Sequence, residues 1–266
     1  MKKVLTIAGS DCSGGAGIQA DLKTFSALGV FGMSVVVSVV AENTFRVIDI
    51  QDITPDIIEK QIEAVFEDIP PDAIKIGMLS SPECMQAVAG KLLTYKPGNI
   101  VIDPVMYAKN GAPLMQQHAE KSLIEIILPL ADVLTPNIPE AEVITGIKIK
   151  NQADMEKAAK AIWKMGCKNV IVKGGHSTGD ATDILFDGHD FHYFHATRVD
   201  TKNTHGTGCT YSSAIAANLA LGYEIKTAVA NAKNYVTTAI MHALPIGKGH
   251  GPTNHFYELY KSGLKN

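Results

Sequence analysis

The sequence predicts an α/β fold, in which a mainly parallel central sheet is covered by helices on both faces. Short strand-like runs alternate with helix-length amphipathic stretches along nearly all of the 266 residues. The strand-like runs are apolar on both of their faces, which is typical of a parallel sheet buried between two helical layers. Glycine-rich and polar motifs follow these runs directly, at the strand ends where ligands bind in open parallel sheets. We therefore expect an active site at the carboxyl edge of the sheet.

The expected strands are short segments rich in Val, Ile and Leu, which pack well in a buried sheet. They are residues 4–8, 33–40, 73–78, 99–104, 132–136 and 169–174. Between the strands, apolar residues recur with the spacing of one helical face, and this pattern predicts helices. The helices are expected at residues 16–29, 55–67, 81–95, 116–128 and 152–165.

The last third of the chain departs from this alternation. In DILFDGHDFHYFHATRV, an Asp-Gly pair between alternating residues predicts a β-hairpin. Two helices are expected after it, at 207–221 and 224–242, with a short one near 253–261. Upstream, the polar AENT and alternating VIDIQDI of residues 41–54 predict an edge strand in a small flap. No linker, repeat or shift of composition divides the chain, so we expect one domain over residues 1–266.

Composition and charge exclude several classes of partner. Apolar residues make up 46% of the chain and charged residues 19%, which suits a globular protein with a sizeable core. The formal net charge is -3 and no basic run exceeds a dipeptide, which argues against nucleic acid and anionic membrane surfaces. The longest apolar stretch, VFGMSVVVSVVA, is too short to cross a bilayer. We therefore expect neither a nucleic-acid nor a membrane partner.

The cysteines and the N-terminal stretch favour a cytoplasmic protein. Cys12, Cys84, Cys167 and Cys209 form no CxxC pair, so neither a zinc site nor a disulfide framework is indicated. The apolar part of the N-terminal MKKVLTIAGS is too short for a signal peptide and is better interpreted as the first strand. Both observations fit a reducing cytoplasm.

A glycine-rich segment raises the alternative of a dinucleotide-binding oxidoreductase. GAGIQA (15–20) matches the loose pattern GxGxxA, and Glu42 ends the second strand, where a ribose-binding acid would lie. A true fingerprint places its first glycine in the turn immediately after the strand. Here the strand ends near Ala8 and GSDCSG intervenes, so the dinucleotide interpretation is a distant alternative. The Walker pattern GxxxxGK[ST] is absent as well.

KNTHGTGCT (202–210) precedes an apolar helix and could bind an anion. Gly206 and Gly208 allow a tight turn and a close approach of the backbone to a ligand. The amides of Thr207, Gly208 and Cys209 would point outward at the positive end of the helix dipole. Many helices begin with glycine-rich segments, so the motif alone leaves an ordinary helix start equally open.

Polar residues at three other strand ends favour a phosphate and magnesium site. In TPNIPE, Asn137 and Glu140 lie on one face of the first turn of an expected helix, and Asp103 ends the fourth strand. Asp103 and Glu140 could bind Mg²⁺ directly or through water when phosphate supplies further ligands. Lys173 follows an apolar strand and could contact phosphate. Taken singly, these residues could also be helix caps, turn residues or a lysine extending to solvent.

The remaining histidines are assigned no chemistry. His189, His192 and His195 lie in the expected hairpin, where the two-residue period of a strand prevents them from forming one metal site. His250 and His255 lie in a glycine-rich segment near the C-terminus.

Taken together, the motifs resemble those of the hydroxymethylpyrimidine/phosphomethylpyrimidine kinases of thiamin biosynthesis, within the ribokinase-like superfamily. The resemblance covers about residues 3–256 and rests on motifs in the family's order: AGSDCSGGAGIQADLKTFSALGVFGMS, KIGML, DPVM, TPNIPEAE, VKGGH, KNTHGTGCT and GHGPTNHF. It implies a ribokinase-like three-layer sandwich. It also implies ATP and Mg²⁺ as cofactors, and phosphoryl transfer to 4-amino-5-hydroxymethyl-2-methylpyrimidine and then to the resulting monophosphate. It further implies a homodimer, while a pyridoxal kinase of the same fold is the close alternative.

The resemblance also implies roles for individual residues. The pyrimidine pocket would use Gly9, Ala16, Val40, Glu42, Met78, Val105 and Cys209. The nucleotide and its phosphates would lie near Asn137, Lys173, His205, Thr207, Gly208 and Lys233, with Asp103 and Glu140 near the metal. Glu42 departs from the glutamine that is common in this branch, and an ionised carboxylate accepts hydrogen bonds without donating any.

Cys209 stands where the wider superfamily has an aspartate as catalytic base. A helix N-terminus depresses the pKa of a thiol, so a Cys209 thiolate could accept the proton of the substrate hydroxyl. The other interpretation is that Cys209 only orients the hydroxyl and that the proton is lost late. The helix-start amides, with Lys173 and Mg²⁺, would stabilise the transferring phosphoryl group.

Overall fold

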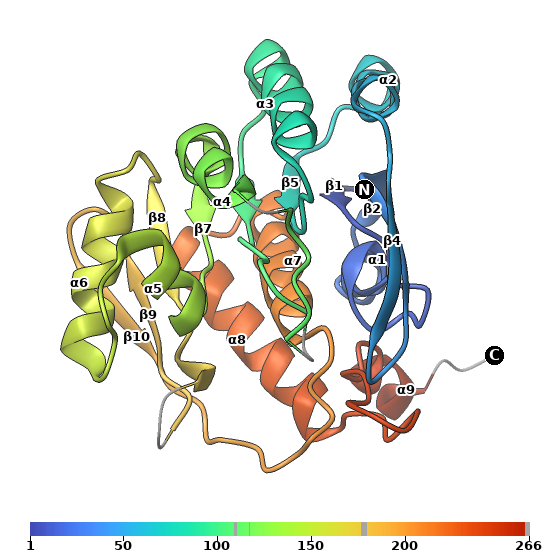
Figure 1. The fold of residues 1–266 in the computed structure, drawn as a ribbon. Helices are drawn as coiled ribbons and strands as arrows, with labels where there is room; N and C mark the ends of the chain where they lie inside the picture. The colour runs from blue at the N-terminus through green and yellow to red at the C-terminus, as the bar shows by residue number, and fades with distance from the viewer. Residues whose placement is uncertain (109–110, 117, 177–179, 264–266) are drawn as a thin grey trace.

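The structure is a computed structural model that describes residues 1–108, 111–116, 118–176 and 180–263. Its centre is a sheet with the strand order β10-β9-β8-β7-β6-β5-β1-β2 (Figure 1). Neighbours from β2 to β8 pair in parallel, whereas β9 runs antiparallel to both of its neighbours. The strands are β1 (Lys3–Ala8), β2 (Phe31–Val36), β5 (Ala73–Ile76), β6 (Ile100–Ile102), β7 (Val133–Leu134), β8 (Asn169–Val172), β9 (Asp183–Phe186) and β10 (Phe191–Phe194). The mainly parallel sheet and the hairpin are therefore confirmed.

The strand expected at 33–40 is wrong as a single element, because the chain leaves the main sheet near Val37. β2 ends at Val36, and β3 (Ser38–Glu42) pairs with β4 (Val47–Asp52) in a separate antiparallel sheet. The buried Ser38 hydroxyl donates to Asp52 at 2.8 Å, so the polar side chain is satisfied at the start of the new pair. This pair is the small flap that the sequence predicts at the edge, although it contains two strands.

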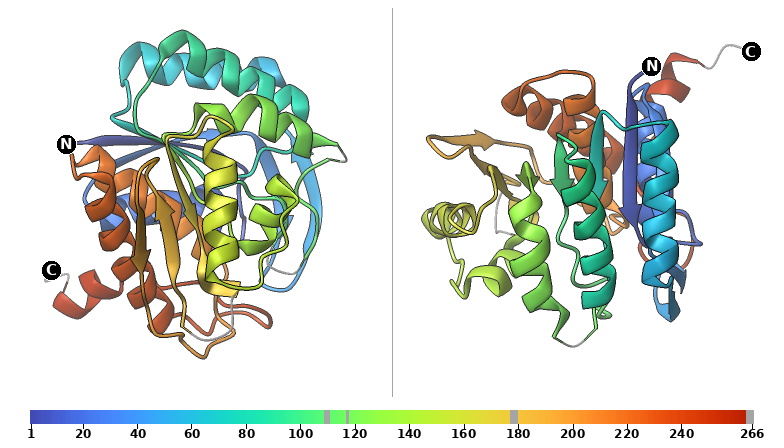
Figure 2. Two further views of the ribbon diagram at one scale, coloured as in Figure 1. Left: turned by 90° about the vertical axis from the view of Figure 1, so that its left-hand side faces the viewer. Right: turned by 90° about the horizontal axis from the view of Figure 1, so that it is seen from above.

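Helices cover both faces of the sheet (Figure 2). One face packs an aliphatic cluster under α2 (Pro55–Asp68), α3 (Pro82–Tyr95), α4 (Ala119–Ser122), α5 (Ile138–Thr145) and α6 (Gln152–Trp163). The other face packs against α1 (Gly17–Ala27), α7 (Thr207–Ala220) and α8 (Ile225–Met241). Burial of these two apolar clusters is the main stabilising contribution and fixes the three-layer arrangement. The short α9 (Tyr257–Ser262) lies near the C-terminus.

The helix expected at 116–128 is only partly correct. Its α-helical part is α4, which continues as a π-helical segment at Leu123–Ile127 and a 3-10 turn at Leu128–Leu130. Pro129 has no N–H to donate to a preceding turn, which explains why the segment ends in a short 3-10 turn and does not continue as α-helix. Residue 117 of the expected helix lies outside the described residues.

Within the described residues, every helix is too short or too polar to span a bilayer.

Candidate active site

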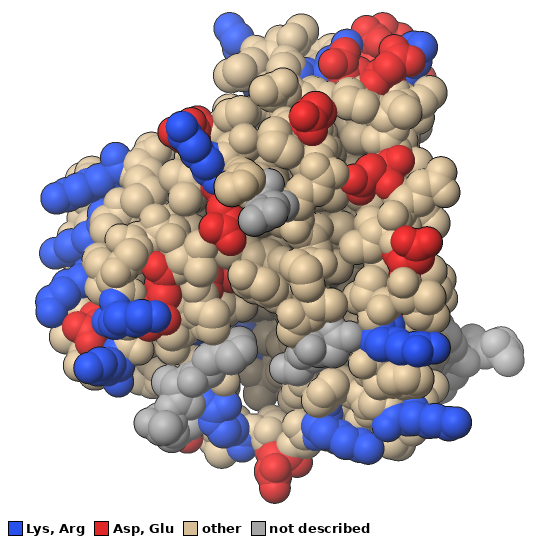
Figure 3. All heavy atoms as spheres, in the orientation of Figure 1, with Lys and Arg blue, Asp and Glu red and all other residues tan. Residues whose placement is uncertain are grey.

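A cavity of about 530 Å³ lies along the carboxyl ends of the parallel strands and the start of α7. Figure 3 shows a hollow in the lower part of one face of the molecule, where this region lies. Every site residue predicted from the sequence lines the cavity: Gly9, Ala16, Val40, Glu42, Met78, Asp103, Val105, Asn137, Glu140, Lys173, His205, Gly206, Thr207, Gly208, Cys209 and Lys233. The topology therefore brings together residues from segments that are far apart in the sequence.

The start of α7 forms a backbone donor site on one wall of the cavity. Gly206 caps the helix with φ 75°, and a Cβ at this position would overlap the carbonyl oxygen of Gly15. Only glycine adopts this positive φ without strain and also lacks the Cβ that would overlap Gly15. The Thr207 amide donates to the Thr204 carbonyl at 3.3 Å, whereas those of Gly208 and Cys209 have no backbone partner among the described residues. Among the described residues, two amides are therefore available to bind an anion at the helix start, where three were expected.

Lys173 and Asp103 form an ion pair opposite this helix start. The Lys173 ammonium lies 2.7 Å from Oδ1 of Asp103, which also accepts from the Thr135 hydroxyl at 3.2 Å. Only 14% of the Lys173 side chain is exposed, so it does not extend to solvent. Burial alone would lower the pKa of Lys173, but the charges of Asp103 and Glu140, together with the hydrogen bond to Asp103, outweigh it and raise the pKa. Lys173 is therefore a fixed cation in the cavity wall.

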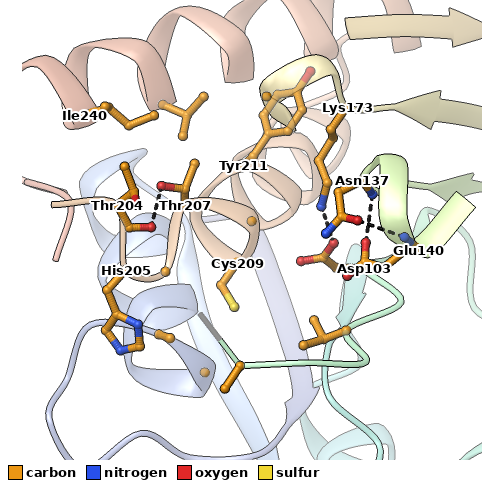
Figure 4. A pocket seen from close by; sticks show the side chains of 18 of the residues that line it. Asp103, Asn137, Glu140, Lys173, Thr204, His205, Thr207, Cys209, Tyr211 and Ile240 are labelled. Atoms are coloured by element: carbon orange, nitrogen blue, oxygen red, sulfur yellow. Dashed lines mark hydrogen bonds and ion pairs between the residues drawn. The ribbon is translucent and has the colours of Figure 1, made fainter. Parts of the chain in front are cut away.

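Asn137 and Glu140 have a structural as well as a site role. The Asn137 side chain accepts from the Glu140 amide at 2.9 Å, and Glu140 Oε2 accepts from the Asn137 amide at 2.7 Å. This reciprocal capping box starts α5 and confirms that the two residues share one face. Burial raises the pKa of Glu140 to about 7, with Lys173 opposing and Asp103 adding to the rise. Figure 4 shows these side chains gathered beside Lys173.

Lys233 reaches the same cavity from α8 through a buried partner that the sequence analysis missed. Its ammonium lies 2.7 Å from Oδ2 of Asp183, at the start of β9. Oδ1 of Asp183 accepts from the Gly174 amide at 2.9 Å, which holds the glycine turn after β8 in place. Asp183 opens the predicted hairpin segment DILFDGHDFHYFHATRV, but nothing in the sequence linked this aspartate to Lys233.

The opposite end of the cavity contains an acidic cluster around His205. His205 Nε2 lies 2.8 Å from Oδ2 of Asp11, and suitable atoms of Asp11, His205 and Glu42 all lie within 4.8 Å of one another. Both oxygens of Asp11 also accept backbone amides of the loop after β1. His205 is therefore placed beside Glu42, at the end assigned to the pyrimidine, and not with Lys173 among the nucleotide groups. Asp11 was not predicted as a site residue, although the GSD after the first strand could have indicated it.

Glu42 has an unusual protonation behaviour in this cluster. Burial raises the pKa of Glu42 to about 7, and the negative charge of Asp11 adds to the rise. For Asp11 itself, burial is outweighed by hydrogen bonds from His205 and the loop amides, so its pKa lies well below the usual range. Glu42 can therefore be a donor or an acceptor near neutral pH, whereas Asp11 stays ionised.

Cys209 lies between the two ends of the cavity, with His205 on one side and the Asp103–Lys173 pair on the other (Figure 4). Burial raises the pKa of Cys209 to about 11, even though the Lys75 ammonium and the Gly17 amide favour the thiolate. The expectation that the helix start lowers the pKa of this thiol is therefore wrong in this structure. Burial and the neighbouring carboxylates of Asp21 and Asp103 outweigh the helix dipole.

The histidines outside the site mostly have structural partners. In the hairpin, His192 lies 2.8 Å from Asp187, and His195 lies 2.9 Å from the Thr182 hydroxyl. His255 is buried and lies 3.0 Å from the Thr210 hydroxyl, one turn into α7. His192 and His195 therefore have different partners in the structure.

Comparison with known proteins decides the family. The family model described as phosphomethylpyrimidine kinase matches residues 11–254, which include every predicted site residue except Gly9.

The chain belongs to the phosphomethylpyrimidine kinase family.

Curated relatives agree with this family assignment. The chain is 51% identical to a hydroxymethylpyrimidine/phosphomethylpyrimidine kinase of Haemophilus influenzae, over 96% of this chain and 97% of the relative. It is also 51% identical to a thiamine biosynthesis bifunctional protein of Geobacter sulfurreducens, over 95% of this chain. The chain spans about half of that longer relative, 52% of its length.

Solved structures confirm the fold of this phosphomethylpyrimidine kinase family member. A phosphomethylpyrimidine kinase from Clostridium difficile matches with a TM-score of 0.82 and 52% identity, over 90% of this chain and 100% of that chain. An ADP complex of Bacillus subtilis pyridoxal kinase matches with a TM-score of 0.89 and 39% identity, over 97% and 99% of the two chains. The ribokinase-like fold predicted from the sequence is confirmed. Pyridoxal kinases share it at lower sequence identity.

Proposed function

We propose that this chain transfers the γ-phosphoryl group of ATP to the hydroxymethyl group of 4-amino-5-hydroxymethyl-2-methylpyrimidine. We extend the proposal to the monophosphate, which would accept a second phosphoryl group to give the diphosphate used for thiamin. One observation supports this most directly: Cys209 lies in one cavity between the Lys173–Asp103 pair and Glu42. A phosphate-binding end and a ring-binding end thus flank the point where the acceptor hydroxyl would lie.

The phosphate end has the groups that phosphoryl transfer requires. The transition state is loose, so the protein contributes mainly positioning and neutralisation of charge. The free amides of Gly208 and Cys209 donate to the transferring group, and the Lys173 ammonium offsets its negative oxygens. Asn137 and Lys233 line the same cavity, where they contact the remainder of the nucleotide.

Asp103 and Glu140 fit the requirements of a Mg²⁺ site. The hydrogen bonds of Asp103 use Oδ1, whereas a Cβ on Gly208 would stand 3.1 Å from Oδ2. The space between α7 and Oδ2 of Asp103 therefore exists because position 208 lacks a side chain. Carboxylate oxygens beside a phosphate site are the ligands that Mg²⁺ prefers. Asp103 and Glu140 would hold the ion directly or through water, and the ion would supply positive charge to the phosphate oxygens.

The ring end matches the edge of an aminopyrimidine. The 4-amino group donates and the adjacent ring nitrogen accepts a hydrogen bond. A protonated Glu42 offers one acceptor and one donor on the same carboxyl group, and its pKa of about 7 makes this form available. Gly9, Ala16, Val40, Met78 and Val105 line the surrounding walls.

Cys209 would orient the acceptor hydroxyl as a thiol. With a pKa near 11, the sulfur is protonated at neutral pH and donates to the hydroxyl oxygen. The hydroxyl proton is then lost late, as the new P–O bond forms. Replacing Cys209 by Ala should lower the turnover number less than about tenfold, whereas a general base contributes about a hundredfold or more.

A pyridoxal kinase activity is the second candidate, because the Bacillus subtilis pyridoxal kinase matches with a TM-score of 0.89. The match of a protonated Glu42 carboxyl group to the donor and acceptor of an aminopyrimidine edge favours the pyrimidine. The test of the proposed function is mass spectrometry of the products after incubation with ATP, Mg²⁺ and the pyrimidine. A mass increase of one and then two phosphoryl groups supports both steps, and no phosphorylated product overturns the proposal.

We also propose that the protein is a cytoplasmic homodimer, as the resemblance implies. Light scattering of the purified protein tests the homodimer, and a monomeric mass would contradict it.

A further inference from the structure

A lysine with no contact to solvent lies in the central strand β5, directly beside the active site. Lys75 has a relative exposure of 0%, yet it lines the cavity that holds Cys209. Its ammonium lies 2.9 Å from Oδ2 of Asp21 on α1, which is also fully buried. Asp21 additionally accepts the hydroxyls of Thr6 and Ser213, both at 2.6 Å. Each oxygen of the Asp21 carboxylate thus accepts at least one hydrogen bond, and the carboxylate holds the Lys75 ammonium in one place.

Helical geometry places this pair directly behind Cys209. Cys209 and Ser213 are four residues apart on α7, so they lie on the same face of that helix. Gly17 and Asp21 are related in the same way on α1, which packs against α7. The Gly17 amide donates to Cys209, and the Ser213 hydroxyl donates to Asp21. Lys75 therefore lies one helical turn behind the thiol, on the side away from solvent.

The backbone around Lys75 leaves room for the ammonium at the cavity. A Cβ on Gly77, two residues along the same segment, would stand 2.6 Å from Nζ of Lys75. The Asp21 charge, with those of Cys209 and Asp103, outweighs burial and raises the pKa of Lys75, so it is always protonated. Apolar residues of similar volume are often as stabilising as a buried ion pair, so stability alone does not explain this arrangement.

We propose that Lys75 is a positioning residue of the phosphoryl-transfer site, whose fixed positive charge behind Cys209 stabilises the negative charge that develops on the acceptor oxygen. This rests on the function proposed above. In the step, the acceptor oxygen forms a bond to the γ-phosphorus, and the bond to ADP breaks with its electron pair going to the ADP oxygen. The hydroxyl proton passes to water. As this proton leaves, negative charge develops on the acceptor oxygen, and a nearby ammonium lowers the energy of that state.

The Cys209 thiol reports the potential that Lys75 creates, independently of kinase activity. Because only the thiolate reacts with iodoacetamide, the alkylation rate at a fixed pH of about 8.5 follows the thiolate fraction. Mass spectrometry of the peptide that contains Cys209 separates it from the other three cysteines. The rate should fall about tenfold or more in Lys75→Met and rise about tenfold in Asp21→Asn, which removes the negative member of the pair. Opposite signs from the two variants distinguish an electrostatic role from a merely structural one.

The remaining variants complete the experiment. Thr6→Val removes a hydrogen bond to Asp21 but keeps every charge, so the alkylation rate should stay within about twofold. In Lys75→Met, kcat should fall about 10- to 100-fold while KM for both substrates changes less than about threefold. Equal or same-direction alkylation changes in Lys75→Met and Asp21→Asn would overturn the inference. If Lys75→Met does not fold, an unchanged or slower rate in Asp21→Asn overturns it alone. Failure of the proposed function would instead show as an inactive wild-type kinase with these thiol shifts intact.

Discussion

The ammonium of Lys173 lies 2.7 Å from the carboxylate of Asp103, and this pair joins the carboxyl ends of β8 and β6 at the active site. Asp103 holds the lysine at the cavity wall, beside the start of α7. A phosphate entering this site meets a fixed cation and two free amides without reorganisation of the protein, which is the condition for electrostatic stabilisation of a transition state.

Removing the cation of this pair should slow the chemical step. Lys173→Met is expected to lower kcat about 100- to 1000-fold, because the transferring group loses a fixed positive charge. Lys168→Met is the matched control, since Lys168 is 75% exposed and pairs with Asp132 away from the cavity. Steady-state kinetics at saturating ATP measure both variants. A Lys173→Met enzyme within about fivefold of wild type would contradict the assigned role.

The space in front of Asp103 should not tolerate a methyl group. In Gly208→Ala, the new Cβ would stand 3.1 Å from Oδ2 of Asp103 and 3.5 Å from Nζ of Lys173, where phosphate and metal would bind. We expect KM for ATP to rise and kcat/KM to fall about 100-fold. Gly90→Ala in α3 is the control, because a Cβ there meets nothing within 4 Å. Equal kinetics for the two variants would show that the space is not used by the nucleotide.

Binding of the pyrimidine should depend on the protonation of Glu42. Its pKa is raised to about 7, so the carboxyl group carries a donor proton below that pH and loses it above. KM for the pyrimidine should therefore rise about tenfold per pH unit above the pKa of Glu42. Glu42→Gln keeps one acceptor and one donor at every pH, so its KM should be flat. Steady-state kinetics across this range test the pair of enzymes, and a flat wild-type profile would exclude a donating Glu42.

Breaking the buried pair behind Cys209 should destabilise the fold. Asp21→Ala leaves the Lys75 ammonium buried without its carboxylate, and such a loss costs about 3–5 kcal/mol of unfolding free energy. Asp56→Ala breaks the exposed pair with Lys60, whose side chains are 71% and 64% exposed, and should change stability little. Urea titrations followed by circular dichroism measure both. Similar midpoints for the two variants would show that the buried pair contributes nothing.

The sequence predicts the strand ends well because local patterns determine them. The β-branched runs, the glycines at 206 and 208, and the Asn137–Glu140 spacing are all short-range features, and each takes the predicted position in the structure. The prediction of a single strand at 33–40 was wrong because a run of apolar residues is equally compatible with one strand or with two strands in different sheets.

The partners of the site residues could not be predicted, because they are distant in sequence. His205 meets Asp11 across 194 positions, and Lys75 meets Asp21 across 54. The sign of the pKa shift at Cys209 failed for the same reason. The sequence indicates that a helix starts near Cys209. The burial that outweighs the helix dipole arises only from the packing of α1, α7 and β5.

The most direct test of the proposed function is a competition between the pyrimidine and pyridoxal for limiting ATP, with both phosphorylated products quantified by mass spectrometry. We expect pyrimidine phosphate to form at least about tenfold faster at equal concentrations, because Glu42 pairs with the aminopyrimidine edge. Faster formation of pyridoxal phosphate would contradict the proposed pyrimidine kinase activity and indicate a pyridoxal kinase.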